Sequence, residues 1–187
     1  MLKVPLERFD EPRIKPKHRK KRILIWCIVV LVIIGLLIPE ELVVPVEQAT
    51  SNDWNHQSFW YEPWGESGVH KGIDIFADKG TSLLSASKGL VLFTGEIKLG
   101  GKIVLVLGPQ WHLHYYAHLD QITTESLSMV GRGEKIGTVG DSGNAKGKQP
   151  HLHYSIVSLL PYFWRIDLST QGWKKMFYLN PHRRLTD

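Results

Sequence analysis

Cysteine is almost absent from this chain of 187 residues, and Cys27 is its one example. A single cysteine provides neither an internal disulfide nor a zinc site built from thiolates. Cys27 lies inside a long apolar run, so the part of the chain that follows this run contains no cysteine. Histidine and the acidic residues are therefore the metal ligands that the sequence offers. We expect stability to come from an apolar core and from any metal that these ligands bind.

Excess charge of one sign is also missing from most of the chain. Residues 1–22 contain nine Lys and Arg against three Asp and Glu, so this segment carries +6. The net charge of the whole chain is +5, which leaves −1 for all remaining residues. The basic excess belongs to a tail, and no nucleic-acid-reading motif accompanies it. We therefore expect no nucleic-acid partner.

The chain has one long apolar run, residues 23–38, which are sixteen residues without a charge. A bilayer span usually requires about 20 apolar residues, with about 17 as the lower limit. The basic residues 19–22 directly before the run can extend a short span, because their stems reach the interface. We predict a single transmembrane anchor with the N-terminus in the cytoplasm and the remainder in the periplasm or extracytoplasmic space. A cleaved signal peptide is the alternative, although no A-x-A-like cleavage site follows.

Glycine is rare before residue 65, where it occurs once, and it occurs sixteen times from there onward. Between these glycines lie short runs of β-branched and aromatic residues, which predict strands at residues 90–94, 103–107, 111–119, 135–139 and 153–157. Residues 98–101 predict a hairpin connection. No sustained helical period and no internal repeat are present in this half. We therefore expect a mainly β fold with a small antiparallel sheet.

These patterns divide the chain into four parts: a disordered basic tail over residues 1–22, the anchor over 23–38, a linker or loosely packed lead-in over 39–64, and a folded domain over 65–187. The lead-in contains an aromatic cluster, Trp54, Phe59, Trp60, Tyr61 and Trp64. Such a cluster either packs against the domain or stacks on a sugar or peptide substrate. Residues 159–176 are an insertion that either shapes a groove wall or caps a sheet edge.

Two histidines near the C-terminal end of the domain suit a shared site. His151 and His153 alternate in a predicted strand, so both side chains point to one face, about 6.6 Å apart. Neutral imidazoles and carboxylates are the ligands that zinc takes in hydrolytic sites, where one position stays open for water. A zinc hydrolase is therefore the leading functional hypothesis.

A second segment supplies a histidine and a carboxylate, His70 and Asp74. Four residues of straight strand would separate them by about 13 Å, which is too far for one ion. Helix is disfavoured there by glycine and β-branched residues. We interpret Gly72 as a bend that swings His70 back over a strand beginning near Ile73.

The remaining histidines give weaker indications of a functional role. Period-two alternation in the strand at residues 111–119 would put four side chains on one face, namely His112, His114, Tyr116 and His118. For His112 and His114 we expect a structural or surface role, because no glycine loop or nearby carboxylate accompanies them. His56 and His182 have no sequence context, so we expect both to be exposed to solvent.

Three motifs in a fixed order resemble a known family. They are His70-Lys71-Gly72-Ile73-Asp74, then Tyr116-Ala117-His118-Leu119, and then a glycine-rich loop that begins at Gly140 and leads into Pro150-His151-Leu152-His153. In these segments the chain resembles the lysostaphin-type (LytM-domain) zinc metallopeptidases, a family of peptidoglycan endopeptidases. The likeness spans roughly residues 65 to 182 and includes the closing Tyr178-Leu179-Asn180-Pro181.

The resemblance implies a small β-sheet or sandwich of the duplicated hybrid motif type. It implies His70, Asp74 and His153 as ligands of Zn²⁺, with His118 and His151 as the catalytic pair. It further implies a hydrolase of peptide bonds in the stem peptides or cross-bridges of peptidoglycan, which would be a role in cell wall remodelling.

The chain departs from the family pattern at three places. The arginine that often precedes the first histidine is absent, Lys148-Gln149 lengthens the loop before the last motif, and Ser155 stands where an acidic residue often follows. Two other functions stay open: a catalytically inactive module that binds or activates another wall hydrolase, and a membrane-tethered wall-binding protein with a structural zinc. The sequence names no protein partner.

Overall fold

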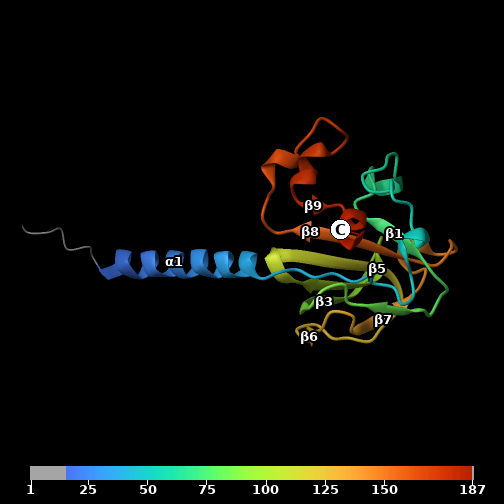
Figure 1. The fold of residues 1–187 in the computed structure, drawn as a ribbon, viewed down its shortest axis with the longest axis horizontal. Helices are drawn as coiled ribbons and strands as arrows, with labels where there is room; N and C mark the ends of the chain where they lie inside the picture. Colours follow the sequence, from blue (N-terminus) through green and yellow to red (C-terminus); the bar gives the residue numbers. More distant parts are fainter. Residues whose placement is uncertain (1–15, 187) are drawn as a thin grey trace, which may run out of the picture. The chain divides into compact units, whose positions relative to one another are not determined.

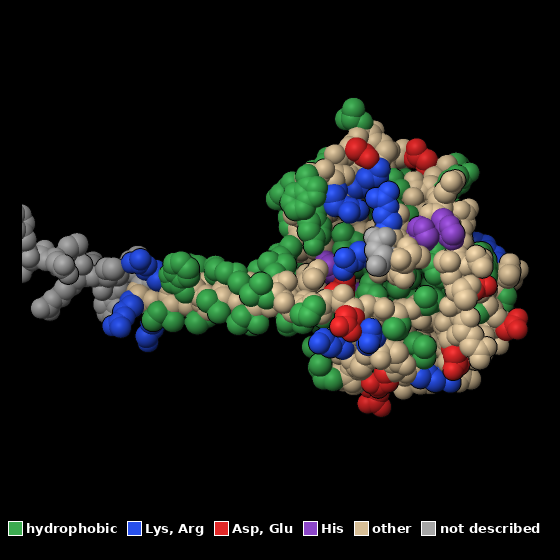
Figure 2. All heavy atoms as spheres, viewed as in Figure 1, with side chains coloured by type: hydrophobic (Ala, Val, Ile, Leu, Met, Phe, Trp, Pro, Cys, Tyr) green, Lys and Arg blue, Asp and Glu red, His purple; other side chains and the backbone are tan. Residues whose placement is uncertain are grey.

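The computed structural model describes residues 16–186, and the chain divides into two compact units that meet at residues 35 and 36. The first unit is most of helix α1, Pro16–Leu37. Its apolar side chains are exposed along the helix (Figure 2). Across the described residues, no helix combines the length and the apolar character needed to cross a membrane. The anchor at residues 23–38 therefore stays a prediction.

Helix α1 begins earlier than the sequence suggested. Residues 16–22, which we assigned to a disordered tail, are helical. Lys and Arg are good helix formers, and residues 19–22 continue directly into the apolar run, which explains why the helix includes them. The part of the predicted tail over residues 1–15 lies outside the described residues.

The second unit is built from antiparallel strands, which confirms the mainly β fold (Figure 1). The strands are β1 Ile73–Phe76, β2 Ser82–Leu84, β3 Gly89–Ile97, β4 Gly101–Leu107, β5 His112–Ile122, β6 Met129–Val130, β7 Lys135–Val139, β8 His151–Ser158 and β9 Tyr178–Leu179. A short helix, α2 Pro181–Thr186, follows β9. The sequence missed β2, β6, β9 and α2, all of which are too short to show a period.

Strand β5 is the centre of the sheet. The strand order is β1-β8-β5-β4-β3-β6, and β5 also pairs with β7 through its C-terminal end. Strand β7 in turn pairs with β2, and β9 pairs with β8. Because β5 has eleven residues, its first half can pair with β8 while its second half pairs with β7. The sheet therefore branches between Ala117 and Leu119 of β5, where the partner strand changes from β8 to β7.

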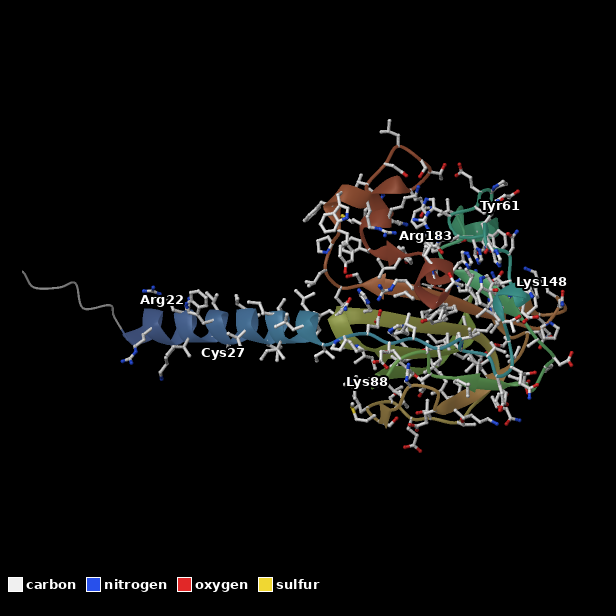
Figure 3. The ribbon with its side chains drawn as sticks, in the orientation of Figure 1. Arg22, Cys27, Tyr61, Lys88, Lys148 and Arg183 are labelled. Atoms are coloured by element: carbon white, nitrogen blue, oxygen red, sulfur yellow. The ribbon has the colours of Figure 1, made fainter. Side chains whose placement is uncertain are left out.

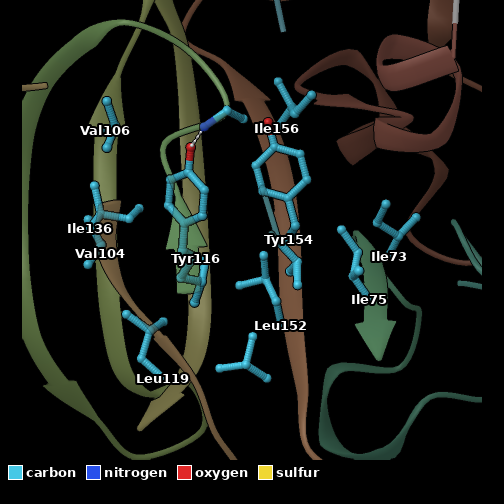
Figure 4. Close-up of a cluster of buried hydrophobic side chains, with 14 of the residues drawn as sticks. Ile73, Ile75, Val104, Val106, Tyr116, Leu119, Ile136, Leu152, Tyr154 and Ile156 are labelled. Atoms are coloured by element: carbon cyan, nitrogen blue, oxygen red, sulfur yellow. Dashed lines mark hydrogen bonds between the residues drawn. The ribbon is translucent and has the colours of Figure 1, made fainter. Parts of the chain in front are cut away.

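The core lies on one face of this sheet, where β8 contributes Leu152, Tyr154 and Ile156, each with no exposed surface (Figure 4). Burial of such a side chain stabilises the fold by about 1.5 to 3 kcal/mol. The ring of Tyr116 packs beside that of Tyr154, and its hydroxyl accepts a hydrogen bond of 2.8 Å from the Ala86 backbone. The buried phenol is thus hydrogen-bonded, so its burial leaves no polar group unsatisfied.

Residues 39–64 are packed against the sheet. The backbone N–H of Val43 donates to Ala86, and that of Glu47 donates to Ser82, each at 3.0 Å. Val46 and Trp54 are buried in the core. This segment is therefore an integral part of the second unit and does not behave as a linker.

A buried ionic cluster joins the start of the lead-in to the sheet and to α2. The Glu40 carboxylate is fully buried and accepts hydrogen bonds from His112 Nδ1 at 2.9 Å and His114 Nε2 at 3.2 Å. Arg184 of α2 donates to the same carboxylate at 2.5 Å. The second nitrogen of His114 accepts from the Tyr154 hydroxyl at 2.7 Å. Both histidines therefore have the structural role that we expected.

Protonation of this cluster follows from its contacts. Burial raises the pKa of Glu40, but hydrogen bonds and Coulomb attraction from His112 and His114 outweigh burial, so the pKa lies well below its usual 4.5. Burial lowers the pKa of His114 below 6.5 despite the nearby Glu40. In both cases the unfolded chain binds a proton more readily than the folded chain. The stability that these two groups contribute is therefore fully present near neutral pH and is lost as the pH falls.

We predict that Glu40→Gln lowers the free energy of unfolding near pH 7 by about 3 kcal/mol or more, because it leaves the buried imidazoles of His112 and His114, and the Arg184 guanidinium, without the carboxylate that they contact. The deficit should shrink below the usual carboxyl pKa of 4.5, where wild-type Glu40 also loses its advantage. Urea unfolding of the full chain, at pH 7 and at a pH below 4.5, measures the difference in free energy of unfolding between variant and wild type.

The matched control is Glu41→Gln. The Glu41 side chain is exposed and pairs with Arg132 at 3.2 Å on the surface. Surface pairs contribute about 0 to 1 kcal/mol, so this variant should unfold almost as the wild type does. Equal losses in the two variants would contradict the assigned role of the cluster.

Candidate metal centre and adjacent histidines

Three potential metal ligands meet at the paired ends of β1 and β8. Their atoms lie within 4.8 Å of one another, and they belong to His70, Asp74 and His153. Asp74 lies directly opposite His153 in the register of the two strands. His70 Nε2 is 3.1 Å from Asp74 Oδ1, and His153 Nδ1 is 2.8 Å from the same oxygen. The structure thus brings together the three residues that the sequence suggested.

Gly72 makes this meeting possible. It forms a bend before β1, as we predicted. A Cβ atom at this position would lie 2.4 Å from the Tyr154 carbonyl oxygen and 2.6 Å from Ser155 Oγ. Those distances are shorter than any tolerated contact, so only glycine lets the chain pass this close to β8 and return His70 toward Asp74.

The donor set fits a cation. The Ser58 carbonyl oxygen can only accept, so His70 Nδ1, at 3.0 Å, carries its proton toward Ser58. In a neutral ring, Nε2 of His70 then presents a lone pair toward both Asp74 Oδ1 and His153 Nδ1, the latter at 3.1 Å. Lone pairs of two imidazoles and a carboxylate that converge in this way match the ligand set of a divalent metal such as zinc.

The electrostatics favour the ligand forms of these groups. Burial raises the pKa of Asp74, but the contacts with His153 and His70 lower it more, so the net shift holds the carboxyl ionised. Burial lowers the pKa of His153, although Asp74 acts in the opposite direction. An ionised carboxylate and neutral imidazoles are the forms that bind a metal.

His118 reaches the same site through an irregularity in β5. Between β4 and β5 the register shifts so that one residue, Ile103, lies opposite two, Ala117 and His118. His118 has the unusual backbone angle φ of 69°. Leu119, the next residue, returns to the core with no exposed surface. The expectation that His118 shares a face with His112, His114 and Tyr116 was therefore wrong, because a β-bulge re-aims one residue and restores the alternation behind it.

The rings of His118 and His151 face each other near the three ligands. Their centroids are 5.0 Å apart, and the His118 ring is 6.1 Å from that of His153. His118 Nδ1 donates to the Ser142 carbonyl at 2.9 Å, and His151 Nδ1 donates to the Gln149 carbonyl at 2.7 Å. In the neutral rings, Nε2 is then the unprotonated nitrogen that can accept a proton. Burial, followed by the nearby His151 and His153, lowers the pKa of His118 to about 4.

Residues around the ligands complete the site, and the sequence motifs did not reveal their contacts. The indole of Trp64 stacks on the His70 ring, with centroids 4.0 Å apart. Ser155 Oγ lies 3.1 Å from His153 Nε2, so it can accept the proton of that ring while Nδ1 faces Asp74. Such second contacts fix the orientation of ligating imidazoles. The aromatic cluster of the lead-in was the one sequence signal for these contacts, and its Trp64 packs on the candidate ligand His70.

The insertion after β8 supports the loop that precedes His70. Trp60 Nε1 donates to the Thr170 carbonyl at 3.1 Å, and Gln171 Nε2 donates to the Ser67 carbonyl at 2.9 Å. The insertion therefore contacts the segment before His70, and the groove-wall and edge-capping roles both stay predictions. Away from the site, His56 is exposed as expected, whereas His182 is half-buried and stacks on it at 4.3 Å. The contact with His56 and the nearby Trp54 explains why the expected exposure of His182 was wrong.

Comparison with known proteins agrees with this geometry. The sequence model of Peptidase family M23 matches residues 68–160. An L-Ala–D-Glu endopeptidase of Bacillus subtilis is 34% identical over 113 residues, which are 56% of this chain and 35% of that protein. The murein hydrolase activator NlpD of Escherichia coli is 30% identical over 105 residues, covering 55% of this chain and 27% of the activator. The match thus covers about a third or less of these curated relatives.

A solved structure supports the fold. The catalytic domain of lysostaphin from Staphylococcus simulans superposes with a TM-score of 0.57 at 23% identity, over 73% of this chain and 96% of that domain. The matched residues contain both β1 and β8 with the three converging ligands. Residues 68–160 therefore form a domain of Peptidase family M23, which confirms the resemblance to the lysostaphin-type (LytM-domain) family.

Proposed function

We propose that this chain is a zinc-dependent endopeptidase that hydrolyses peptide bonds in the stem peptides or cross-bridges of peptidoglycan. The observation that carries the proposal is the convergence of two oriented histidines, His118 and His151, on a cluster of three potential metal-ligand atoms. The name of one curated relative, a peptidoglycan DD-endopeptidase of Vibrio cholerae, supports a peptidoglycan substrate. Among related proteins the peptidases and an activator both occur, so activity must be tested directly.

His70, Asp74 and His153 would hold the metal through Nε2, a carboxylate oxygen and Nδ1. A zinc ion there would supply Lewis-acid polarisation of the carbonyl group in the peptide bond that is cleaved. Ser58, Trp64 and Ser155 keep the two imidazole ligands in place through their contacts with His70 and His153. The protein therefore supplies a site whose ligands are already oriented.

His118 and His151 supply the proton chemistry. Each ring is fixed by its Nδ1 hydrogen bond to a backbone carbonyl, so that Nε2 is the nitrogen that accepts a proton when the ring is neutral. One Nε2 can take a proton from the attacking water and deliver it to the nitrogen of the leaving amine as the C–N bond breaks, while the other Nε2 accepts a hydrogen bond from the same water and can take its second proton. The products are a carboxylate and an amine. General acid–base assistance of this kind contributes about 10² to 10⁴ in rate.

The alternative function is a module that activates another wall hydrolase without cleaving peptide bonds itself. The 30% identity to the activator NlpD favours it. The two functions differ in whether the purified chain cleaves peptidoglycan by itself.

We further propose that α1 anchors the chain in the cytoplasmic membrane, with the N-terminus in the cytoplasm and the peptidase domain in the periplasm or extracytoplasmic space. The sixteen uncharged residues 23–38 and the basic residues before them support this orientation. Peptidoglycan lies on that side of the membrane, so the proposed substrate and the proposed topology agree.

Alanine at His70, Asp74 or His153 should each remove the bound zinc or weaken its binding strongly, because loss of one of three ligands leaves an incomplete site. The measurement is zinc content after dialysis of the reconstituted full chain, by elemental analysis. His56→Ala, at an exposed histidine, is the control and should keep one zinc per chain. Full zinc content in all three ligand variants would contradict the assignment.

His118→Ala and His151→Ala should keep the zinc and the fold but slow hydrolysis by about 10²-fold or more. Digestion of purified peptidoglycan, with mass analysis of the products, should release new amino termini and leave the glycan intact. New reducing sugar ends would mean a different reaction class, and no cleavage by the zinc-loaded wild type would favour the activator. If His151→Ala lost the zinc and His153→Ala kept it, the two roles would be reversed.

The topology proposal predicts a full-length, membrane-bound product. Protease added outside the cytoplasm should reach residues beyond Pro39, since these follow the anchor. Immunoblotting of membrane and soluble fractions measures this. A mature soluble form that begins after Ile38 would instead support a cleaved signal peptide.

A further inference from the structure

The insertion over residues 159–176 exposes a group of large apolar side chains. Trp164 is 78% exposed and Phe163 is 66% exposed, and Leu159 and Ile166 are exposed as well. We call these four residues the apolar patch. Figure 2 shows hydrophobic side chains gathered over this part of the domain. A folded domain seldom exposes such a group unless it contacts a membrane or another protein there.

Hydrogen bonds hold the insertion in place. The backbone N–H of Tyr162 donates to the Met176 carbonyl at 2.8 Å, and Arg165 Nη2 donates to the Tyr178 carbonyl at 2.9 Å. The Tyr162 ring contacts the Trp164 ring edge to face, with centroids 5.2 Å apart. The apolar patch is therefore part of a fixed surface, and its exposure does not come from a loose loop.

The insertion begins at the end of the domain where the chain enters from residue 38. The Tyr162 hydroxyl lies 3.3 Å from His112 Nε2, and His112 Nδ1 donates to the buried Glu40. Because Nδ1 carries its proton toward the carboxylate, Nε2 of the neutral ring accepts from Tyr162. Glu40 follows Ile38, the end of the apolar run, by two residues, a distance of at most about 7 Å. The residue that ends the proposed anchor therefore lies at the same end of the domain as the start of the insertion.

The insertion also carries an excess of positive charge. Residues 159–176 include three Lys or Arg and one Asp, so the segment carries +2, whereas all residues after residue 22 together carry −1. Burial lowers the pKa of Arg165, and the nearby Arg183 of α2 lowers it further, so α2 adds a neighbouring cation. Anionic phospholipids attract basic residues close to a bilayer. The charge of this surface therefore complements an anionic membrane.

We propose that the insertion binds the surface of the bilayer that holds the anchor, with the apolar patch in the interfacial region and the basic residues at the headgroups of anionic phospholipids. Trp is enriched at this depth of a membrane, because its ring has an apolar body and a polar N–H. The inference rests on the proposed anchor and does not depend on hydrolysis. It gives the domain a second contact with the membrane, so that the domain lies against the bilayer.

A second copy of the chain is the other occupant that such a patch could have. In a symmetric dimer each copy would present the same surface to the other. Two identical surfaces with a positive excess would then place like charges opposite each other, which is unfavourable. The charge of the insertion thus favours the bilayer over a dimer.

The test places a fluorophore on the insertion of the full chain, reconstituted in vesicles of equal parts phosphatidylcholine and phosphatidylglycerol. Cys27→Ser removes the single cysteine, so that Ile166→Cys can be labelled alone with an environment-sensitive nitrobenzoxadiazole group. We expect emission from position 166 at shorter wavelength than in water, and strong quenching by lipids that carry a nitroxide near the headgroup, because the label lies at the interface.

Lys148→Cys, labelled in the same way, is the matched control. Lys148 precedes β8, whose seven steps from His151 to Ser158 span about 23 Å toward the end where the insertion begins. Figure 3 shows Lys148 at the opposite end of the domain from the start of β5. The label at position 148 should keep the emission of a water-exposed group and escape the lipid quencher.

Two variants test which side chains make the contact. Phe163→Ser combined with Trp164→Ser should lower the ratio of quenched to unquenched label at position 166 about tenfold or more, because two buried aromatic side chains are lost. Arg183→Gln should lower the same ratio up to about fivefold, as should vesicles of phosphatidylcholine alone. Ile97→Ser, at an exposed isoleucine in the β3–β4 hairpin, should leave the ratio unchanged.

Equal emission and quenching at positions 166 and 148 in the anchored chain would overturn the inference and leave the anchor proposal intact. Emission at shorter wavelength from position 166 without quenching by the lipid would also overturn it, since a second copy or another protein would then cover the patch. If alkaline carbonate extracts the full chain from the vesicles, the anchor proposal fails. Quenching at position 166 before that extraction, lost in the double serine variant, would still support the surface contact, and its absence would reject both.

Discussion

Strand β8 pairs with β1 on one side and with β5 on the other, and its residues alternate between two environments. Leu152, Tyr154 and Ile156 face the core, while His151 and His153 face the site. The β1 register places Asp74 opposite His153, and the β5 register places Ala117 opposite the same histidine. A slip of one residue would exchange the two faces, burying the histidines and exposing the core residues. The apolar core therefore fixes the position of the site.

Each face of β8 carries a polar network, and consecutive residues of the strand belong to the two networks in turn. On the core face, the Tyr154 hydroxyl donates to His114, which binds the buried Glu40. On the other face, His153 lies against Asp74 and Ser155. Each buried polar group in these networks has a partner, whereas Ser58 Oγ does not.

The β-bulge in β5 holds His118 in a strained backbone conformation. A non-glycine residue at positive φ costs on the order of 1 to 3 kcal/mol, and such residues persist only where the surroundings hold them. The His118 N–H donates to Gly100 at 2.8 Å, its ring donates to Ser142, and Leu119 fills the core behind it. These contacts keep the His118 side chain on the site face, whereas a regular strand would have turned it toward the core.

The sequence by itself determined the strands with strong β-branched and aromatic runs, the bend at Gly72, and the residues that form the candidate site. Those features are local, because they depend on alternation, on glycine, and on residue types that bind metal. Only the tertiary structure decided which face His118 takes, since a bulge depends on pairing between β4 and β5. It also decided that His112 and His114 bind Glu40, 72 and 74 residues away in sequence, and that the lead-in forms a cavity beside Asp74. Contacts between distant segments follow from packing of the whole sheet, and no local pattern encodes them.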